Sequence, residues 1–237
     1  MRKIVAGMMV SVDGVVEAPE TWTGPYFSPE LGQLVGSLMA ASDTLLLGRA
    51  TYQAFAASFA GNNSDPMAAQ MSAFPKVVVS TTLSQAEWEN TTVIGADVAA
   101  EVTRLKEGPG KNINISGSPT LVTWLLRQGL LDELNLLLFP VVVGHGRRLF
   151  AAEGDTAGLR LAHSQAFGTG VVQLVYNPAL PSHWPSRWPS DWAARFSRAV
   201  RSAAFLVRAA ARRNSPAASA WRPSLASRSP RTAGSWG

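Results

Sequence analysis

The feature that most constrains this 237-residue chain is an alternation of short apolar runs with segments whose apolar residues recur at helical spacing. An apolar run of about four to eight residues fits a strand that is buried on both faces. Parallel strands need a crossover, which is usually a helix, so the alternation predicts a largely parallel sheet with helices on both faces. The buried strands are expected at residues 4–10, 44–47, 76–80, 92–94, 112–116 and 134–143.

Helices are expected after most of these strands. The start of one helix is marked by several N-terminal capping signals. Ser28 is placed to cap a first turn in which Pro29 occupies the first helical position and Glu30 adds a favourable acid. Other helices are expected near Thr51, from residue 98 and from Ser118, with a loop at 62–66.

The last apolar segments of the pattern differ from the rest because no helix separates them. Residues 162–167 and 171–176 flank a Gly-Thr-Gly turn at 168–170, which predicts an antiparallel hairpin that closes the sheet. The predicted fold class is therefore α/β, with three αβα layers, a mostly parallel central sheet and a C-terminal antiparallel hairpin.

The charge of the chain divides near residue 180. After Pro181 the sequence holds ten arginines, no lysine and one acid, Asp191, which gives that segment a charge of +9, whereas 1–180 carries 11 basic and 15 acidic residues. We therefore expect a folded domain over 1–179 and a basic tail, rich in Pro, Ser, Arg and Trp, over 180–237. Nucleic acid is not an expected partner of the acidic domain.

Within the tail, residues 190–213 place apolar side chains on one side of a helical wheel and arginines on the other. A basic amphipathic helix of this kind suits an anionic surface. The alternative is a largely disordered extension, such as a read-through product, with little role in the chemistry of the domain.

Composition excludes several classes of site. The chain has no cysteine, which removes disulfides, thiolate metal ligands and cysteine nucleophiles. Its three histidines, His145, His163 and His183, show no metal-ligand spacing, so no metal site is expected. The apolar run at the N-terminus is short for a signal peptide or a membrane span, and we expect a soluble, cytoplasmic protein.

Two predicted turns have the chemistry of a phosphate site. Gly48, Arg49 and Thr51 follow one strand and open a helix, where free backbone amides attract anions and a guanidinium can hold phosphate. Thr51 is expected to cap this helix, with its hydroxyl meeting a phosphate. Ser116, Gly117, Ser118 and Thr120 repeat this arrangement after another strand, with Ser118 expected as the helix cap. Each turn alone is equally well explained as an ordinary strand-to-helix connection, but ligands of open α/β sheets bind at such strand ends.

Other polar residues follow predicted strands with weaker signals. Ser80 and Thr81 end the 76–80 strand with hydroxyls that suit a phosphate, although simple capping explains them better. Asp13 follows the first strand beside Gly14, and an Asp-Gly turn is an equal alternative to a catalytic carboxylate. Glu30 is most simply a first-turn acid of its helix.

The ordered set of motifs resembles the dihydrofolate-reductase-like superfamily. Later stretches, Gly129-Leu130-Leu131-Asp132-Glu133-Leu134 and Gly146-Arg147-Arg148-Leu149-Phe150 among them, are similar to the C-terminal reductase domain of the bifunctional riboflavin-biosynthesis deaminase-reductase. The likeness spans about residues 3–177. The motifs that carry its first part are Ser11-Val12-Asp13-Gly14, Leu47-Gly48-Arg49-Ala50-Thr51-Tyr52, Val78-Val79-Ser80 and Gly117-Ser118-Pro119-Thr120-Leu121.

This resemblance implies NADPH as cofactor and a homodimer as the assembly. It implies that Gly48, Arg49 and Thr51 hold cofactor phosphates, that Ser80 and Thr81 lie near the adenosine 2′-phosphate, and that Ser116, Gly117 and Ser118 line the pyrophosphate. Thr120 is a further cofactor-binding candidate. Asp13 and Glu30 would be the catalytic candidates, and Ser11, Trp22 and Tyr52 would contact a small-molecule substrate.

The chain departs from the riboflavin reductases at two motif positions. Ser116 stands where those enzymes usually carry Glu, and Val15 follows Asp-Gly where they tend to carry Lys. The chain therefore resembles the stand-alone members of the family more closely.

The function expected is NADPH-dependent hydride transfer to a small heterocyclic or imine-like substrate. The alternatives are a nucleotide-binding module without efficient turnover and an interaction protein that acts through its basic tail.

Overall fold

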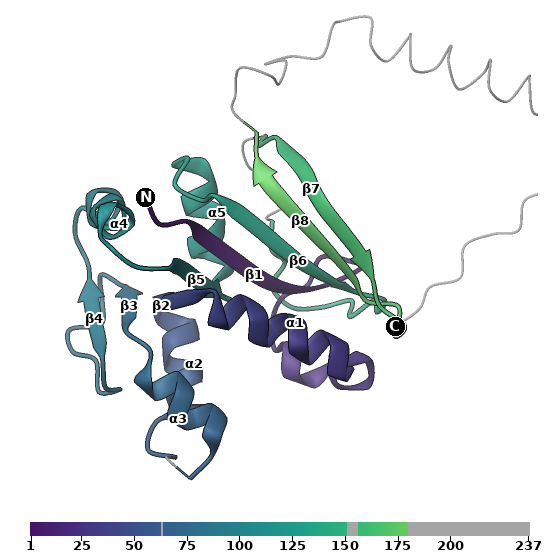
Figure 1. Ribbon diagram of the computed structural model, residues 1–237, viewed down its shortest axis with the longest axis horizontal. Helices are drawn as coiled ribbons and strands as arrows, with labels where there is room; N and C mark the ends of the chain where they lie inside the picture. The colour runs from purple at the N-terminus through teal and green to yellow at the C-terminus, as the bar shows by residue number, and fades with distance from the viewer. Residues whose placement is uncertain (63, 151–155, 180–237) are drawn as a thin grey trace, which may run out of the picture. The chain divides into compact units, whose positions relative to one another are not determined.

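The computed structural model describes residues 1–62, 64–150 and 156–179, and the predicted tail with its helix at 190–213 lies outside these residues. Within them one eight-stranded sheet has the order β4-β3-β2-β5-β1-β6-β8-β7, with β4 at one edge and β7 at the other (Figure 1). The strands are β1 (Ile4–Ser11), β2 (Ser42–Gly48), β3 (Lys76–Val79), β4 (Thr91–Ile94), β5 (Asn112–Ser116), β6 (Glu133–Phe139), β7 (Leu159–Ala166) and β8 (Val172–Pro178).

The α-helices fall between these strands, as the alternation of the sequence predicts. They are α1 (Pro29–Ala40), α2 (Arg49–Phe59), α3 (Pro66–Ala73), α4 (Val98–Glu107) and α5 (Pro119–Arg127), and short 3₁₀ turns form at Pro19–Thr21 and Gly24–Tyr26.

The strand directions confirm the predicted fold class. β1 pairs in parallel with β5 and β6, and β2 pairs in parallel with β3 and β5, whereas β8 is antiparallel to β6 and β7 is antiparallel to β8. β3 also pairs in parallel with β4, although no helix separates these two strands. The six strands β1 to β6 are thus parallel, and the hairpin at the C-terminal end closes one edge.

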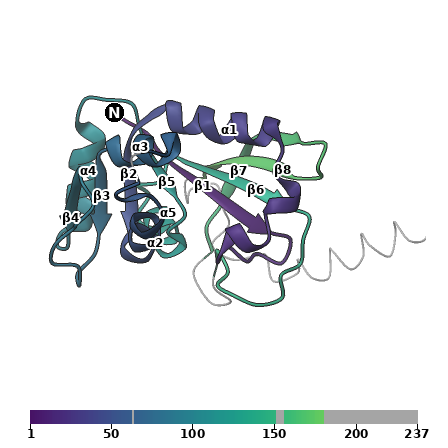
Figure 2. The ribbon, with the colours of Figure 1, turned by 90° about the horizontal axis from the view of Figure 1, so that it is seen from below.

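Successive strand residues point to opposite faces of the sheet and divide the core into two layers. One face packs Leu46, Ile113 and Ile115 against Val102 of α4 and Leu125 of α5. The other face packs Leu45 and Leu47 against α2 and α3, and it packs Leu137 and Phe139 against α1, which lies along one side of the strands (Figure 2). The αβα prediction is therefore confirmed.

The start of α1 follows the predicted signals, and another helix was missed. Ser28 caps α1, because its Oγ accepts a hydrogen bond from the Leu31 amide at 3.2 Å. The sequence prediction ended a loop at residue 66 and assigned no helix beyond it. Asp65 caps α3 in the same way, with Oδ1 accepting from the amides of Met67 and Ala68 at 2.7 and 3.2 Å. The Ala-rich sequence of α3 gives little apolar periodicity, which explains the omission.

The predicted strand at 134–143 is too long at its C-terminal end. β6 stops at Phe139 because Pro140 has no amide to continue the ladder. The chain then runs beside the end of β1, where the Val12 amide donates to the Val141 carbonyl at 2.9 Å. In the part of the chain that the structure describes, no helix is long and apolar enough to cross a membrane.

Candidate functional site

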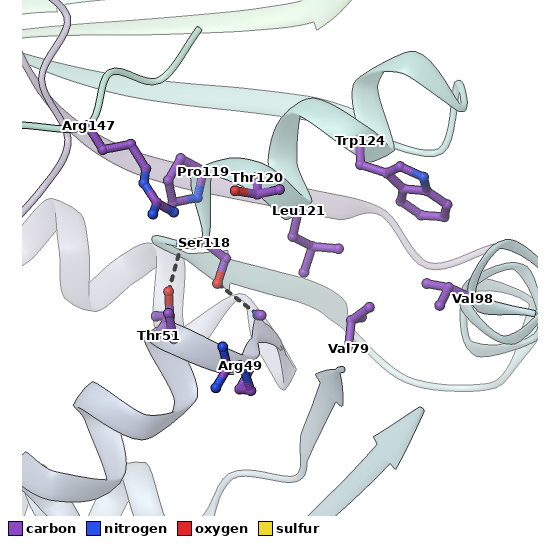
Figure 3. A pocket seen from close by; sticks show the side chains of 12 residues that line it. Arg49, Thr51, Val79, Val98, Ser118, Pro119, Thr120, Leu121, Trp124 and Arg147 are labelled. Carbon is purple, nitrogen blue, oxygen red and sulfur yellow. Dashed lines mark hydrogen bonds between the residues drawn. The ribbon is translucent and has the colours of Figure 1, made fainter. Parts of the chain in front are cut away.

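The two predicted phosphate turns lie side by side at the carboxyl edge of the sheet. β2 and β5 are neighbours, so the turns that follow Gly48 and Ser116 meet. Two hydrogen bonds join them: the Gly48 amide donates to Ser118 Oγ at 2.8 Å, and the Ser118 amide donates to Thr51 Oγ1 at 3.0 Å (Figure 3). The structure therefore brings both turns into one site.

These bonds correct the capping roles that the sequence predicted for Thr51 and Ser118. Gly48 is the N-cap of α2, so Thr51 lies inside its first turn. Ser118 is the N-cap of α5, but its φ is 60° and its side chain caps no amide of the helix. A left-handed cap residue turns its hydroxyl away from the helix, and here the oxygen meets the neighbouring turn instead.

Gly117 allows this close contact between the turns. Its φ is +78°, and a Cβ at this position would lie 3.2 Å from Thr51 Cγ2. Only glycine adopts this backbone region without strain, and only glycine leaves the adjacent space for Thr51.

A cavity of about 500 Å³, which we call the edge cavity, opens at these turns (Figure 3). Polar groups from the turns line one part of it, and apolar side chains from β3, α4 and α5 line another. The lining residues are Gly48, Arg49, Ala50, Thr51, Val79, Val98, Ser118, Pro119, Thr120, Leu121, Trp124 and Arg147.

Helix ends make the edge cavity electropositive. The first residues of α2, α4 and α5, which are Arg49, Val98 and Pro119, all line it, and none of these helices has a side-chain cap. The capped helices α1 and α3 begin elsewhere. First-turn amides have no partner inside a helix, so the starts of three helices bring positive partial charge to the lining of one cavity. Among the described residues, its lining includes Arg49, Arg147 and no carboxylate.

A second cavity of about 580 Å³, which we call the central cavity, lies between α1 and α2, on the face of the sheet that these two helices cover. Its floor comes from β1, β5 and β6, and apart from Thr51 the residues that α1 and α2 contribute to its walls are apolar. It shares Ala50, Thr51, Ser118, Pro119 and Arg147 with the edge cavity, so the two cavities are adjacent, and we call them together the continuous site. Gly117 and Ser116 line the central part rather than the edge part.

Arg147 belongs to both linings, and the sequence analysis gave it no role. Two backbone bonds fix its position: its amide donates to Glu17 Oε2 at 2.7 Å, and its carbonyl accepts from the Val16 amide at 2.9 Å. Its side chain extends toward Pro119 at the start of α5 (Figure 3). A glycine on either side of His145 marks this loop in the sequence, but no local pattern shows which cavity the arginine enters.

Asp13 lies outside the linings of both cavities. Its Oδ1 accepts from Ser11 Oγ at 2.6 Å and from the Val143 amide at 3.1 Å, and its Oδ2 accepts from the Gly144 amide at 2.9 Å. The Ser11 hydroxyl first, and then the Gly144 and Val143 amides, lower the pKa of Asp13 from 3.8 to about 2. This carboxylate holds the loop that leads to Arg147.

The other residues predicted for catalysis and substrate binding also lie outside both linings. Ser11 is buried in the turn with Asp13, and Glu30 is exposed on the first turn of α1. Trp22 packs edge-on against Phe139, with its Nε1 donating to the Glu17 carbonyl at 2.9 Å. Tyr52 is buried, and its hydroxyl accepts from the Trp88 amide at 3.0 Å.

Ser80 and Thr81 are likewise absent from the linings of the edge and central cavities. Ser80 Oγ accepts from the amides of Thr82 and Leu83 at 3.2 and 2.9 Å, so its hydroxyl oxygen shapes a turn. Of the predicted cofactor residues, the structure gathers Gly48, Arg49, Thr51, Ser116, Gly117, Ser118 and Thr120 in the continuous site.

The sequence has relatives that match most of its length. The family model described as the RibD C-terminal domain matches residues 2–173. The chain is 30% identical to the uncharacterized protein YyaP of Bacillus subtilis (strain 168) over 192 residues, which are 77% of this chain and 95% of that one.

Solved structures share the fold at low identity. A protein from Shewanella sp. PV-4, with a proposed role in riboflavin biosynthesis, matches with a TM-score of 0.61 and 19% identity over 76% of this chain and all of that one. A pyrimidine reductase-like protein from Corynebacterium diphtheriae matches with a TM-score of 0.53 and 14% identity over 76% of this chain and 92% of that one. This chain belongs to the RibD C-terminal domain family, and it shares its α/β fold with these two solved structures.

Proposed function

We propose that this protein is an NADPH-dependent reductase that transfers hydride to a small heterocyclic or imine-like substrate. The observation that carries the proposal is the convergence of three uncapped helix N-termini and two arginines on the edge cavity. Phosphates are the common ligands of such helix ends, and bidentate arginine contacts add both affinity and orientation. Membership in a reductase-like family supports the same assignment.

The residues of the continuous site fit a dinucleotide. Val79, Leu121 and Trp124 offer an apolar surface for a flat ring at one end of the edge cavity. The interlocked turns at Gly48 and Ser118 provide the polar middle. A reduced nicotinamide supplies hydride when bound. In this proposal the cofactor extends from the edge cavity past the shared lining residues to the central cavity, where the substrate binds.

Each side chain has a definite task in this proposal. Arg49 and the α2 amides hold a phosphate, and Arg49 favours the cofactor that carries the additional 2′-phosphate. Thr51 and Ser118 keep the two turns at a fixed separation, so the cofactor path has a constant width. The apolar walls of the central cavity exclude water from the region of hydride transfer.

The proposal is tested by titrating the full-length protein with NADPH and with NADH, followed by fluorescence. We expect Arg49→Ala to weaken NADPH binding by about 10- to 100-fold, because a charge-assisted contact is worth about 1.5–3 kcal/mol. NADH lacks the 2′-phosphate, and its affinity should fall less.

Arg104→Ala is the matched control for this measurement. Arg104 is an exposed arginine of α4 that pairs with Glu101 and does not line the edge cavity. Equal losses for NADPH and NADH in Arg49→Ala, or wild-type protein that ignores NADPH at millimolar concentration, would contradict the assignment. An NADPH oxidation assay over candidate substrates separates a reductase from a nucleotide-binding module, which would bind without turnover.

A further inference from the structure

Arg147 lies where the edge cavity and the central cavity adjoin, with its charge unpaired. It lines both cavities, whereas Arg49 lines the edge cavity alone. Arg2 and Arg104 each pair with a carboxylate, but among the described residues no hydrogen bond or ion pair involves the Arg147 guanidinium. An unpaired cation beside a cavity can contact an anionic ligand without first giving up another partner.

The backbone of Arg147 is fixed in a short antiparallel ladder that residues 14–17 form with residues 146–149. Both backbone bonds of Arg147, to the Glu17 carboxylate and from the Val16 amide, belong to this ladder. Two apolar side chains of the ladder join the hydrophobic core and anchor it to the sheet. These side chains are Val16 and Leu149.

Consecutive residues of an extended segment point to opposite sides, and this separates the two arginines of the loop. The side chain of Arg147 extends toward Pro119 at the start of α5 (Figure 3). Arg148 lies outside both linings, and its guanidinium comes within 3.9 Å of Asp13 Oδ2. The ladder therefore presents one arginine to the cavities and keeps its neighbour outside them.

Glu17 binds the backbone of Arg147 and leaves the charge of its side chain unmatched. Glu17 Oε2 accepts the Arg147 amide at 2.7 Å, and no ion pair joins the two side chains. Gly146 leaves space for this carboxylate, because a Cβ there would lie 3.1 Å from Oε2, and its φ of +101° favours glycine. The contact thus holds the arginine in place while its guanidinium stays available.

The two arginines of the continuous site follow one another along the path of a dinucleotide. Arg49 begins α2 and does not line the central cavity, whereas Arg147 does. They lie on opposite sides of Ser118 in Figure 3. A cofactor that extends from the edge cavity into the central cavity passes Arg49 first and Arg147 second. Arg147 is therefore the cation nearer to the nicotinamide half.

We propose that Arg147 is a cofactor-binding residue that contacts the phosphate on the nicotinamide side of the dinucleotide, and that Glu17 is its positioning residue. This inference rests on the proposed function, because it takes the ligand of the continuous site to be a nicotinamide dinucleotide. Arg147 is exposed to solvent, so its contact is weaker than that of a buried pair. NADPH and NADH both carry this phosphate, so Arg147 serves them equally.

The test titrates full-length protein by calorimetry with three ligands: NADPH, NADH and adenosine 2′,5′-bisphosphate, which lacks the nicotinamide half. We expect Arg147→Ala to weaken NADPH and NADH alike, by about 5- to 20-fold, because both lose one charge-assisted contact. The bisphosphate has no phosphate at this position, and its affinity should stay within about twofold of wild type. Arg49→Ala should instead weaken NADPH more than NADH.

Arg148→Ala is the matched control, because it removes the same charge from the next residue of the ladder. Its side chain is 56% exposed and lies outside both linings, so all three affinities should stay at their wild-type values. A loss of all three in Arg147→Ala would show damage to the loop rather than the loss of one phosphate contact.

Variants of Glu17 test the positioning role. Glu17→Gln keeps an oxygen that can accept the Arg147 amide, so it should bind NADPH at least as tightly as wild type. Glu17→Ala removes the acceptor and should weaken NADPH and NADH but not the bisphosphate. Because Glu17 acts through Arg147, Glu17→Ala should cause no further loss when Arg147 is already alanine.

Unchanged NADPH affinity in Arg147→Ala would overturn this inference alone, as would a loss shared by all three ligands or one confined to NADPH. Losses from Glu17→Ala that multiply with those of Arg147→Ala would overturn the positioning role. Wild-type protein that binds none of the three ligands would overturn the proposed function together with this inference, so the two failures are distinguishable.

Discussion

Lys76 offers a stability prediction whose size and pH dependence both follow from its contacts. It is the first residue of β3 and only 1% exposed, and its Nζ donates to the carbonyls of Met71, Ser72 and Phe74 at 3.2, 2.9 and 2.6 Å. The ammonium also lies 4.3 Å from the centroid of the Trp88 ring. These carbonyls end α3, so the lysine acts as the C-terminal cap that this helix otherwise lacks.

The Lys76→Met variant keeps most of the apolar stem and removes the donors. The Ser72 carbonyl retains a bond from Asn90 Nδ2 at 3.1 Å, but the other two carbonyls lose the ammonium. A buried acceptor left without a partner costs about 1–3 kcal/mol, and the cation–π contact adds about 1 kcal/mol. Relief of the buried charge offsets part of this loss, so we expect the free energy of unfolding to fall by about 2–4 kcal/mol near neutral pH.

The sign of the pH dependence follows from the lowered pKa. Burial lowers the pKa of Lys76 from 10.5 to about 8, and the charge of Glu89 opposes the shift. Between these two pH values the unfolded chain binds more protons than the folded chain, so the free energy of unfolding of the wild-type protein increases as the pH rises. The deficit of Lys76→Met should therefore grow by about 1–2 kcal/mol from about pH 7 to about pH 9.5.

Urea unfolding at both pH values measures this deficit, with Lys3→Met as control for an exposed lysine. A free energy of unfolding of Lys76→Met within about 0.5 kcal/mol of wild type near pH 7, or a deficit that shrinks as the pH rises, would contradict the capping role of Lys76.

Two further variants probe the turns and the loop of the site. Gly117→Ala should lower the free energy of unfolding by about 1–3 kcal/mol and weaken NADPH binding, because the added Cβ would lie 3.2 Å from Thr51. Gly129→Ala is the control, because Gly129 has a similar φ of +67° but its Cβ would lie in open space. Equal effects of the two variants in calorimetry and titration would refute the crowding of Thr51. Asp13→Asn should reduce the free energy of unfolding at neutral pH and not near pH 2. The carboxyl has a pKa of about 2 in the folded chain and 3.8 in the unfolded chain, so protonation removes the wild-type advantage as the pH falls. A difference in acid unfolding that persists below about pH 2 would contradict this role.

Local patterns determined the elements of this fold, because the periodicity of apolar residues depends only on neighbours in sequence. The run at 76–80 was predicted as a strand, and β3 occupies Lys76–Val79. The predicted cap at Ser28 was correct for the same reason, since a cap and its amide are three residues apart. Parallel connections also place the ends of β2 and β5 at one edge, which allowed the turns at Gly48 and Gly117 to be predicted as one site.

The partners of polar side chains were not predictable in this way, because each depends on chain segments that are distant in sequence. Ser118 Oγ accepts from the Gly48 amide, 70 residues away in sequence, and Thr51 Oγ1 accepts from the Ser118 amide, 67 residues away. Asp13 accepts from the Val143 amide, which is 130 residues away. A carboxylate or a hydroxyl after a strand has the same local signature whether it faces a ligand or holds a loop. Cofactor contact by the gathered residues therefore stays a prediction.

The sequence by itself determined most of the segments that become strands and helices and placed the carboxyl ends of the parallel strands at one edge, since those follow from short-range periodicity and the rules of parallel connection. Only the tertiary structure decided that Lys76 caps α3, that Arg147 enters both cavities and that Glu17 accepts the Arg147 amide. The physical reason is that burial and hydrogen-bond satisfaction belong to the packed environment of a side chain, which distant segments supply.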